Sequence, residues 1–231
     1  MNGKMIVFDG NSILNRAYYG VRPLNTKDGF PTNALFGFVN ILQKNLAPGY
    51  DYAAIAYDLR EKTFRHIRCD TYKATRRPMP EDLAKQLPVS KEIAELMGLH
   101  VLTAAGFEAD DILGTLSRIA KENDVECVIV TGDRDSYQLV CDGVTVHLAA
   151  NNETRIIDTK AIDELYGLTP SQLIDLKAVM GDSSDNISGV PGIGEKGALE
   201  LMHQYGSLDG IYAHIDEIKG SKKTKLENGR E

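Results

Sequence analysis

Carboxylates are crowded into a few short motifs of this 231-residue chain. The stretch EADD, at 108–111, places three acids within four residues, between an apolar run and a helical pattern. Further acids close the apolar runs KMIVFDG and YAAIAYD, and others stand in TGDRD and GDSSDN. Carboxylate oxygens are the ligands that Mg²⁺ and Mn²⁺ prefer. The motifs therefore point to metal-ion chemistry.

Each acidic motif, taken alone, also has a structural explanation. Acids at a helix N-terminus are favoured by capping and by the helix dipole, and TGDRD and GDSSDN suit turns. Together, however, nine acids would meet in one crevice, where like charges repel strongly. Two neighbouring hard cations would remove this repulsion, and such a pair can drive displacement at phosphorus. The predicted metal ligands are Asp9, Asp58, Glu108, Asp110, Asp111, Asp133, Asp135, Asp182 and Asp185.

The apolar runs before these acids have the length of buried strands. We expect strands in the runs at 4–10, 52–58, around 99–105 and 126–135, with a fifth short strand at 144–149 near the sheet edge. Helical patterns lie between them in ALFGFVNILQKNLA, EDLAKQLPVSKEIAELMG and DDILGTLSRIAKEN. This alternation predicts an α/β fold with a mostly parallel central sheet flanked by helices. Parallel strands end at a common edge where ligands bind, so the fold would gather the acids there.

A different pattern begins near residue 160, where short helical stretches are joined by Gly, Pro and Ser. Within it, GVPGIGEK at 189–196 has the composition of a tight turn whose backbone N–H groups can face a phosphate at a helix start. An ordinary helix–helix turn is the alternative. The candidate phosphate contacts are Gly189, Gly192, Gly194 and Lys196, with Lys222, Lys223 and Lys225 as further cations.

Charge is distributed unevenly along the chain. The net charge is −7, yet residues 60–77 carry seven Lys/Arg against two acids, a net +5 that leaves −12 elsewhere. Phe64 and Tyr72 lie among these cations, and basic charge interleaved with aromatics suits single-stranded nucleic acid. A solvated basic face is the alternative. We predict nucleic-acid contacts at Arg65, Tyr72 and Arg77.

Composition limits the class of protein. An apolar fraction of 42% supports a sizeable core, and no apolar run approaches the roughly 18 residues of a membrane span. The start of the chain lacks the pattern of a secretory signal. The three cysteines show no C-x-x-C spacing, and no His or Cys stands in the acidic motifs, so a zinc site is disfavoured. We expect a monomer in a reducing cytoplasm, without membrane contact.

The motifs FDGNSILNRAY, AYD, TFR, YKATRRPMPEDL, EADDILGTL, TGDRDSYQLV and MGDSSDNISGVPGIGEKGA resemble, in this order, the 5′ nuclease domain of bacterial DNA polymerase I, a relative of flap endonucleases. The resemblance runs from about residue 4 to 215. It implies a PIN-like nuclease core over 1–160, with an arch at about 60–90 above the active site. It also implies a helix-hairpin-helix DNA-binding subdomain over 161–231, shorter than usual in that family.

The resemblance also implies roles for individual residues. One metal ion belongs to the positions matching Asp9, Asp58 and the 108–111 motif, and the second to those matching Asp133, Asp135, Asp182 and Asp185. Lys73 and Arg76 match catalytic arch residues that steer the scissile phosphate, and Arg16 matches a basic residue after the first metal motif. The hairpin around Gly192 and Gly194 is a candidate K⁺ site. Asn15 stands where several relatives carry a base-stacking aromatic, so stacking would pass to Tyr18, Tyr19 or Tyr72.

The implied function is a Mg²⁺-dependent 5′→3′ exonuclease and 5′-flap endonuclease that hydrolyses DNA by a two-metal mechanism in replication and repair. Mn²⁺ is expected to substitute for Mg²⁺. RNA–DNA hybrids are a further candidate substrate, and a polymerase module a candidate attachment in the full gene product. Two alternatives stay open: a non-catalytic fragment that binds branched DNA, and a related metal-dependent ribonuclease.

Overall fold

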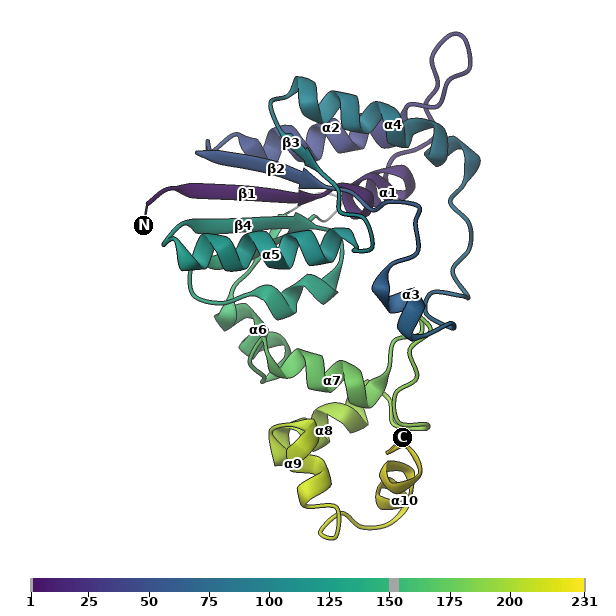
Figure 1. The fold of residues 1–231 in the computed structure, drawn as a ribbon, viewed down its shortest axis with the longest axis vertical. Helices are drawn as coiled ribbons and strands as arrows, with labels where there is room; N and C mark the ends of the chain where they lie inside the picture. Colours follow the sequence, from purple (N-terminus) through teal and green to yellow (C-terminus); the bar gives the residue numbers. More distant parts are fainter. Residues whose placement is uncertain (1, 150–153, 231) are drawn as a thin grey trace. The chain divides into compact units, whose positions relative to one another are not determined.

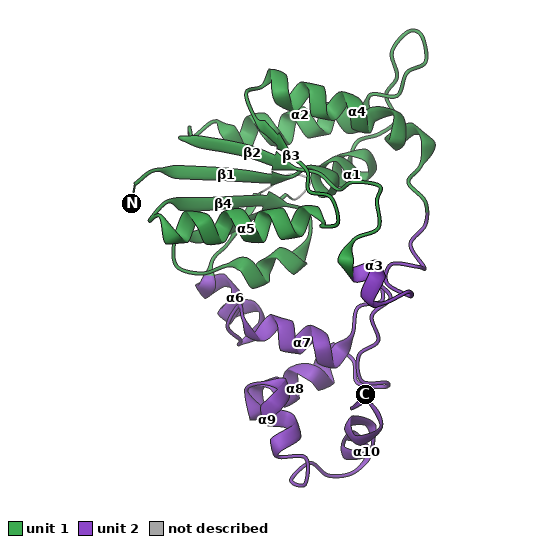
Figure 2. Cartoon of the chain, viewed as in Figure 1, with its two compact units in different colours: residues 1–64, 78–158 green, residues 65–77, 159–231 purple. Residues whose placement is uncertain are grey.

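The computed structural model describes residues 2–149 and 154–230. Contacts within the chain divide it into two compact units, coloured separately in Figure 2. Unit 1 comprises Met1–Phe64 and Pro78–Asp158, and unit 2 comprises Arg65–Arg77 and Thr159–Glu231. The basic segment 65–77 thus groups with the C-terminal helices, although it lies between two parts of unit 1 in the sequence. Each unit is described by itself.

Unit 1 is built on a six-stranded sheet with the strand order β3-β2-β1-β4-β5-β6 (Figure 1). Its first five strands are parallel, and β6 runs antiparallel to β5. This confirms the predicted mostly parallel sheet. The strand at 144–149 lies one position inside the edge, because β6, which we did not predict, pairs outside it. The strands are β1 (Lys4–Asp9), β2 (Tyr52–Ala56), β3 (His100–Leu102), β4 (Glu126–Thr131), β5 (Val144–Ala149) and β6 (Thr154–Ile157).

Helices cover the sheet as the alternating sequence pattern predicts. Side chains of α1, α2 and α4 form one apolar cluster with Ile6 and Phe8 of β1. Val7, between them and fully buried, lies outside that cluster and points to the opposite face of the sheet, because successive strand residues alternate. Helix α5 packs along β1 and β4. The bounds are α1 (Gly10–Gly20), α2 (Asn33–Leu46), α4 (Glu81–Leu96), α5 (Ala109–Glu122) and the 3-10 helix η1 (Arg134–Leu139).

Unit 2 consists of short helices around a small apolar core. Leu176, Val179, Val190, Ala198 and Leu201 are all buried there. Helices α7 and α8 pack against each other, and the Gly-rich stretch 189–194 lies in the connection between them. No helix in the described part of the chain has the length and apolar character needed to cross a membrane. The helices are α3 (Phe64–Arg68), which starts at the end of unit 1, α6 (Thr159–Tyr166), α7 (Gln172–Met180), α8 (Glu195–Tyr205), α9 (Leu208–Ala213) and α10 (Ser221–Asn228).

The junction of β1 and α1 depends on a glycine. Helix α1 begins at Gly10, directly after the strand, and Gly10 lies against the buried ring of Tyr57. A Cβ at this position would lie 2.6 Å from two carbons of that ring. The Tyr57 hydroxyl is bonded to Ser90 Oγ at 3.0 Å, which fixes the ring where it stands. The absence of a side chain at Gly10 therefore lets the first strand turn directly into its helix.

We predict that Gly10→Ala lowers the free energy of unfolding by about 1–3 kcal/mol, because the added methyl overpacks against Tyr57. The matched control is Gly114→Ala in α5, where the nearest atom to an added Cβ is a Leu139 methyl carbon at 3.4 Å. Alanine there should raise stability by up to about 1 kcal/mol, from helix propensity. Urea titration of both variants measures the difference. Equal stability of the two variants would show that Tyr57 does not confine this junction.

Candidate active site

Asp9 is the buried centre of the candidate site. It ends β1 and caps α1, where its carboxylate accepts the Ser12 N–H at 3.0 Å and the Thr131 hydroxyl at 2.8 Å. Its exposed fraction is 5%. Burial, with smaller contributions from the charges of Asp58 and Asp133, raises its pKa to about 6 despite those hydrogen bonds. Asp58 and Asp133, which follow two other strands, are thus close enough to Asp9 to disfavour its ionisation.

Asp58, just past β2, connects two predicted motifs. Its backbone N–H donates to Asn11 Oδ1 at 2.9 Å, and its carboxylate accepts the Ala109 N–H at 2.7 Å. The second bond holds the first turn of α5 beside the end of β2. Within α5, Asp111 accepts the Glu108 N–H at 2.9 Å in a capping box. The capping explanation for EADD therefore holds for Asp111, while Asp110 is exposed at the same helix start.

Thr131 and Ser12 tie the ends of β4 and β1 together. The buried Thr131 hydroxyl donates to Asp9 and accepts the Asp133 N–H at 3.0 Å. Ser12 Oγ accepts the Gly132 N–H at 3.0 Å. Asp133 then caps η1 by accepting the Asp135 N–H at 2.9 Å. We did not predict a role for the hydroxyl of Thr131 or Ser12. The only sequence signal was that these residues stand near the DG and GD turns.

The acids of unit 1 fit a hydrated hard cation better than a closed metal cage. In residues 2–149 and 154–230, no three His, Cys, Asp or Glu side chains are grouped closely enough to hold an ion among them. Mg²⁺, however, usually retains several waters and takes only one or two protein carboxylates. Asp9, Asp58 and Asp133 supply carboxylates alone, and Asp58 and Asp133 lie close enough to Asp9 for their charges to raise its pKa. A divalent cation beside them would offset that repulsion.

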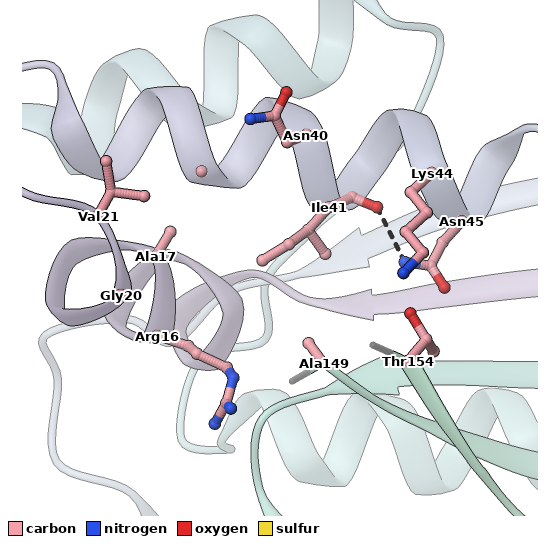
Figure 3. A pocket seen from close by; sticks show the side chains of 11 residues that line it. Arg16, Ala17, Gly20, Val21, Asn40, Ile41, Lys44, Asn45, Ala149 and Thr154 are labelled. Atoms are coloured by element: carbon pink, nitrogen blue, oxygen red, sulfur yellow. Dashed lines mark hydrogen bonds between the residues drawn. The ribbon is translucent and has the colours of Figure 1, made fainter. Parts of the chain in front are cut away.

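Arg16 lies next to this acidic edge. A Cβ on Gly132 would be 3.3 Å from Arg16 Cδ, so the glycine leaves room for the arginine side chain. Arg16 Nε is buried and, in the part of the chain that is described, has no hydrogen-bond partner. Arg16 also lines a groove of about 360 Å³ that α1 and α2 form with the ends of β5 and β6 (Figure 3). Lys44 and Asn40 of α2 line the same groove, and the sequence pattern of α2 did not single them out.

Asp182, in unit 2, belongs to a hydrogen-bonded loop. Its carboxylate accepts the Ser184 N–H at 2.8 Å, the Ser184 hydroxyl at 2.7 Å and the Lys177 ammonium. Partial burial opposes ionisation, but these donors lower the pKa of Asp182 below its ordinary value. The structural explanation for GDSSDN, a hydrogen-bonded turn, therefore holds for Asp182, and its carboxylate stays ionised.

Asp185 binds the basic segment directly. Its carboxylate lies 2.5 Å from an Arg76 nitrogen, 3.1 Å from the Tyr72 hydroxyl and 4.0 Å from Lys73 Nζ. Two of the predicted catalytic cations, Lys73 and Arg76, thus meet a predicted metal ligand within unit 2. Arg65 is half-buried and Arg77 is exposed on the same segment.

The three aromatic candidates for base stacking differ in exposure. Tyr72 is 7% exposed, with its ring edge-on to His66 at 5.2 Å and 4.9 Å beneath Lys73 Nζ. This arrangement packs the ring inside unit 2, so stacking by Tyr72 is not supported. Tyr18 is half-buried, whereas Tyr19 is 72% exposed. Tyr19 is therefore the one of the three that presents a largely open ring.

Each glycine of the hairpin occupies its position for a different structural reason. Gly189 lies against the backbone of Gly181, where an added Cβ would be 2.2 Å from a nitrogen. Gly192 has a φ of +81°, and its carbonyl accepts Lys225 Nζ at 2.9 Å. Gly194 caps α8 and faces open space. Gly194 and the exposed Lys196 thus leave the start of α8 accessible, as a phosphate contact requires.

A mostly parallel sheet with acids at its C-terminal edge and a helical unit with a basic segment are compatible with a nuclease, and the comparisons with known families decide the class. The family described as "5′-3′ exonuclease, N-terminal resolvase-like domain" matches residues 4–167. The family described as "5′-3′ exonuclease, C-terminal SAM fold" matches residues 168–231. The chain therefore belongs to the 5′-3′ exonuclease family, a family of nucleases.

Curated relatives are DNA polymerases. The chain is 41% identical over 233 residues to DNA polymerase I of Caldicellulosiruptor bescii, covering 99% of the chain and 27% of that protein. It is 39% identical over 228 residues to DNA polymerase I of Bacillus subtilis, covering 97% and 26% respectively. The chain thus spans about a quarter of the length of these relatives.

Solved structures share the fold. The bacteriophage T5 5′-exonuclease with divalent metal ions (zinc) bound has a TM-score of 0.75 at 24% identity, over 97% of this chain and 83% of that one. The bacteriophage T5 flap endonuclease in a pseudo-enzyme–product complex with DNA and metal ions has a TM-score of 0.77 at 22% identity, over 98% and 84%. The catalytic core of Rad2 in complex with DNA substrate has a TM-score of 0.61 at 18% identity, over 99% and 73%.

The raised pKa of Asp9 predicts a pH-dependent stability in the presence of a chelator. The folded protein binds this proton at a pKa of about 6, and the unfolded chain at about 3.8, so ionised Asp9 destabilises the fold above pH 6. Wild type should therefore gain stability relative to Asp9→Asn as pH falls through 6, until the difference levels off below about pH 4. The full change should approach about 3 kcal/mol, since one pKa unit is about 1.4 kcal/mol.

Denaturant titrations of both proteins from pH 8 to pH 4 with EDTA measure this change. Asparagine keeps an oxygen for the Ser12 N–H, so the α1 cap is retained in the variant. A difference between the two proteins that does not vary with pH would mean that Asp9 carries no electrostatic strain.

Proposed function

We propose that this chain is a divalent-metal-dependent 5′→3′ exonuclease and 5′-flap endonuclease that hydrolyses DNA phosphodiesters in replication and repair. The observation that carries this proposal is the buried Asp9 carboxylate, whose pKa is raised to about 6 by burial and by the charges of Asp58 and Asp133. Stability alone gives no reason to bury one carboxylate beside two others. Binding of a hard divalent cation gives such a reason, because its charge offsets the repulsion between the carboxylates.

The proposed metal ligands are the nine acids of the sequence motifs, with Mg²⁺ as the expected ion and Mn²⁺ as a substitute. When bound, a pair of such ions supplies a water of lowered pKa and stabilises the leaving oxygen. Within unit 1, the Ser12 N–H and the Thr131 hydroxyl donate to the Asp9 carboxylate, and Asn11 Oδ1 accepts the Asp58 backbone N–H. Donors such as those on Asp9 fix how a carboxylate is presented to a cation.

The cations and the hairpin are the proposed nucleic-acid contacts. Lys73 and Arg76 would bind the phosphate that reacts, since Arg in particular matches the geometry of phosphate oxygens. Gly192, Gly194 and Lys196 would contact duplex phosphates at the start of α8. Tyr19 replaces Tyr72 as the proposed base-stacking residue, because its ring is exposed.

The setting of the activity is also proposed. Relatives that are named DNA polymerase I are about four times longer than this chain, so a fused polymerase module is the expected partner in the full gene product. All three cysteines, Cys69, Cys127 and Cys141, are free thiols, which fits the reducing cytoplasm expected from the sequence. DNA with a 5′ flap or a nick is the expected substrate, and RNA paired to DNA is a second one.

We predict that Asp133→Asn lowers the cleavage rate of a 5′-flap duplex at least 100-fold at saturating Mg²⁺, because a proposed metal ligand loses its charge. The matched control is Asp142→Asn, which neutralises an exposed acid outside the acidic motifs and should cleave like wild type. Parallel reactions with EDTA, with an RNA–DNA hybrid and with a nicked duplex define metal dependence and substrate. Wild-type turnover by Asp133→Asn, or by wild type in EDTA, would contradict the proposed function.

A further inference from the structure

Asp185 is the internal counter-ion of the basic segment 65–77. Arg76, Tyr72 and Lys73 all direct polar groups at its carboxylate, at 2.5, 3.1 and 4.0 Å. The Asp185 side chain is only 15% exposed and that of Lys73 18%. Water therefore screens this pair less than an ordinary surface ion pair.

Backbone contacts hold the two segments together around this carboxylate. The Lys73 N–H donates to the Asp185 carbonyl at 2.8 Å, and Arg76 Nε donates to the Ser184 carbonyl at 3.2 Å. In the other direction, the Asn186 amide donates to the Thr71 carbonyl at 2.7 Å. Lys73 and Asn186 have φ values of 56° and 55°, in the left-handed region that few residues other than glycine adopt. Segment 65–77 and residues 184–186 are therefore held together in one specific backbone conformation.

The side chains of this ion-pair cluster can also bind two external ligands of opposite charge, a phosphate and a divalent cation. Arg76 and Lys73 suit a phosphate, which competes with a carboxylate for the same guanidinium geometry. Asp185 is a proposed ligand of a divalent cation, which competes with Arg76 and Lys73 for the same oxygens. The carboxylate and the cations thus satisfy each other in the absence of both ligands.

We propose that Asp185 is a latch that couples phosphate binding to divalent-cation binding. In the free protein its carboxylate neutralises Arg76 and Lys73. A nucleic-acid phosphate that takes over these cations releases the carboxylate for the metal ion, and a metal ion on the carboxylate releases the cations for phosphate. This inference rests on the proposed function in taking Asp185 as a metal ligand and Lys73 and Arg76 as phosphate contacts.

Thermodynamic reciprocity gives the latch a measurable consequence. If a phosphate strand raises the affinity for the cation by some factor, the cation raises the affinity for the strand by the same factor. Each ligand alone binds more weakly than the two together, because each must break the ion pairs of Asp185. Asp182 provides an internal contrast, since its carboxylate accepts bonds from Lys177, Ser184 and the Asp185 N–H, none of which lies in segment 65–77.

The test measures Mn²⁺ binding by electron paramagnetic resonance, with and without a phosphorothioate 5′-flap duplex. For wild type, the duplex should tighten Mn²⁺ binding about 5-fold or more, in the usual range of allosteric coupling. Arg76→Gln should bind Mn²⁺ more tightly than wild type without the duplex, and the duplex should then add little. The matched control is Lys219→Gln, which removes an exposed charge from the same unit, outside segment 65–77, and should behave like wild type.

A second pair of variants keeps all the charges. Tyr72→Phe removes the hydroxyl that binds Asp185, and should shift Mn²⁺ affinity in the same direction as Arg76→Gln, by a smaller factor. Tyr212→Phe removes a comparable hydroxyl bond, 3.2 Å to the Leu226 carbonyl in the same unit, and should leave Mn²⁺ binding unchanged. Thermal melts of all four variants establish that each one is folded.

The outcomes separate the latch from the proposed function. If wild type binds Mn²⁺ and cleaves flaps, but neither the duplex nor Arg76→Gln alters Mn²⁺ affinity, the latch is wrong and the proposed function stands. Equal effects of Arg76→Gln and Lys219→Gln would show a general effect of net charge on Mn²⁺ binding and would also overturn the latch. If wild type neither binds Mn²⁺ nor cleaves, both the proposed function and the latch fall.

Discussion

A carboxylate buried at the end of the first strand is the constraint around which unit 1 is arranged. Asp9 caps α1 and accepts a hydroxyl from Thr131, yet its ionised form is disfavoured by burial and by Asp58 and Asp133. The hydrogen bonds stabilise the position of this group, while its charge destabilises the protein. A site that holds a charge at such a cost is suited to a ligand of opposite charge, and the proposed metal-dependent nuclease function rests on this feature.

Unit 2 also contains a largely buried carboxylate, but there cations of the same chain offset its charge. There the acid, Asp185, is matched by cations of its own chain, Arg76 and Lys73, which come from a segment more than 100 residues earlier. In unit 1, the nearby charges that raise the pKa of Asp9 belong to other acids, Asp58 and Asp133. Unit 1 therefore holds a carboxylate beside groups of the same charge, whereas unit 2 holds a carboxylate bound to cations that two incoming ligands can separate.

Much of the fold followed from the sequence, because the strongest signals were local. The stretches MIVF of β1 and CVIV of β4 are uninterrupted apolar runs, as in strands buried on both faces, and α5 has a clear amphipathic pattern after EADD. The strand β6 was missed because it has four residues, and two of them, Arg155 and Ile156, are exposed at the sheet edge. A strand this short buries too few side chains to give a recognisable hydrophobic pattern in the sequence.

The site was less predictable than the fold, for a physical reason. The acids could be found because their types and positions after strands are visible in the sequence. Their hydrogen-bond partners could not, since Thr131 and Ser12 are ordinary turn residues until the sheet brings β4 beside β1. The burial of Tyr72 against Asp185 depends on a pairing across 113 residues, which no local pattern encodes.

The most direct measurement of the central claim is the pKa of Asp9 itself, followed by the carboxyl carbon resonance in ¹³C NMR, with and without Mg²⁺. The account predicts a pKa of about 6 in metal-free protein and a value below the ordinary 3.8 when Mg²⁺ is saturating. A pKa near 4 without metal, or one that Mg²⁺ leaves unchanged, would contradict it.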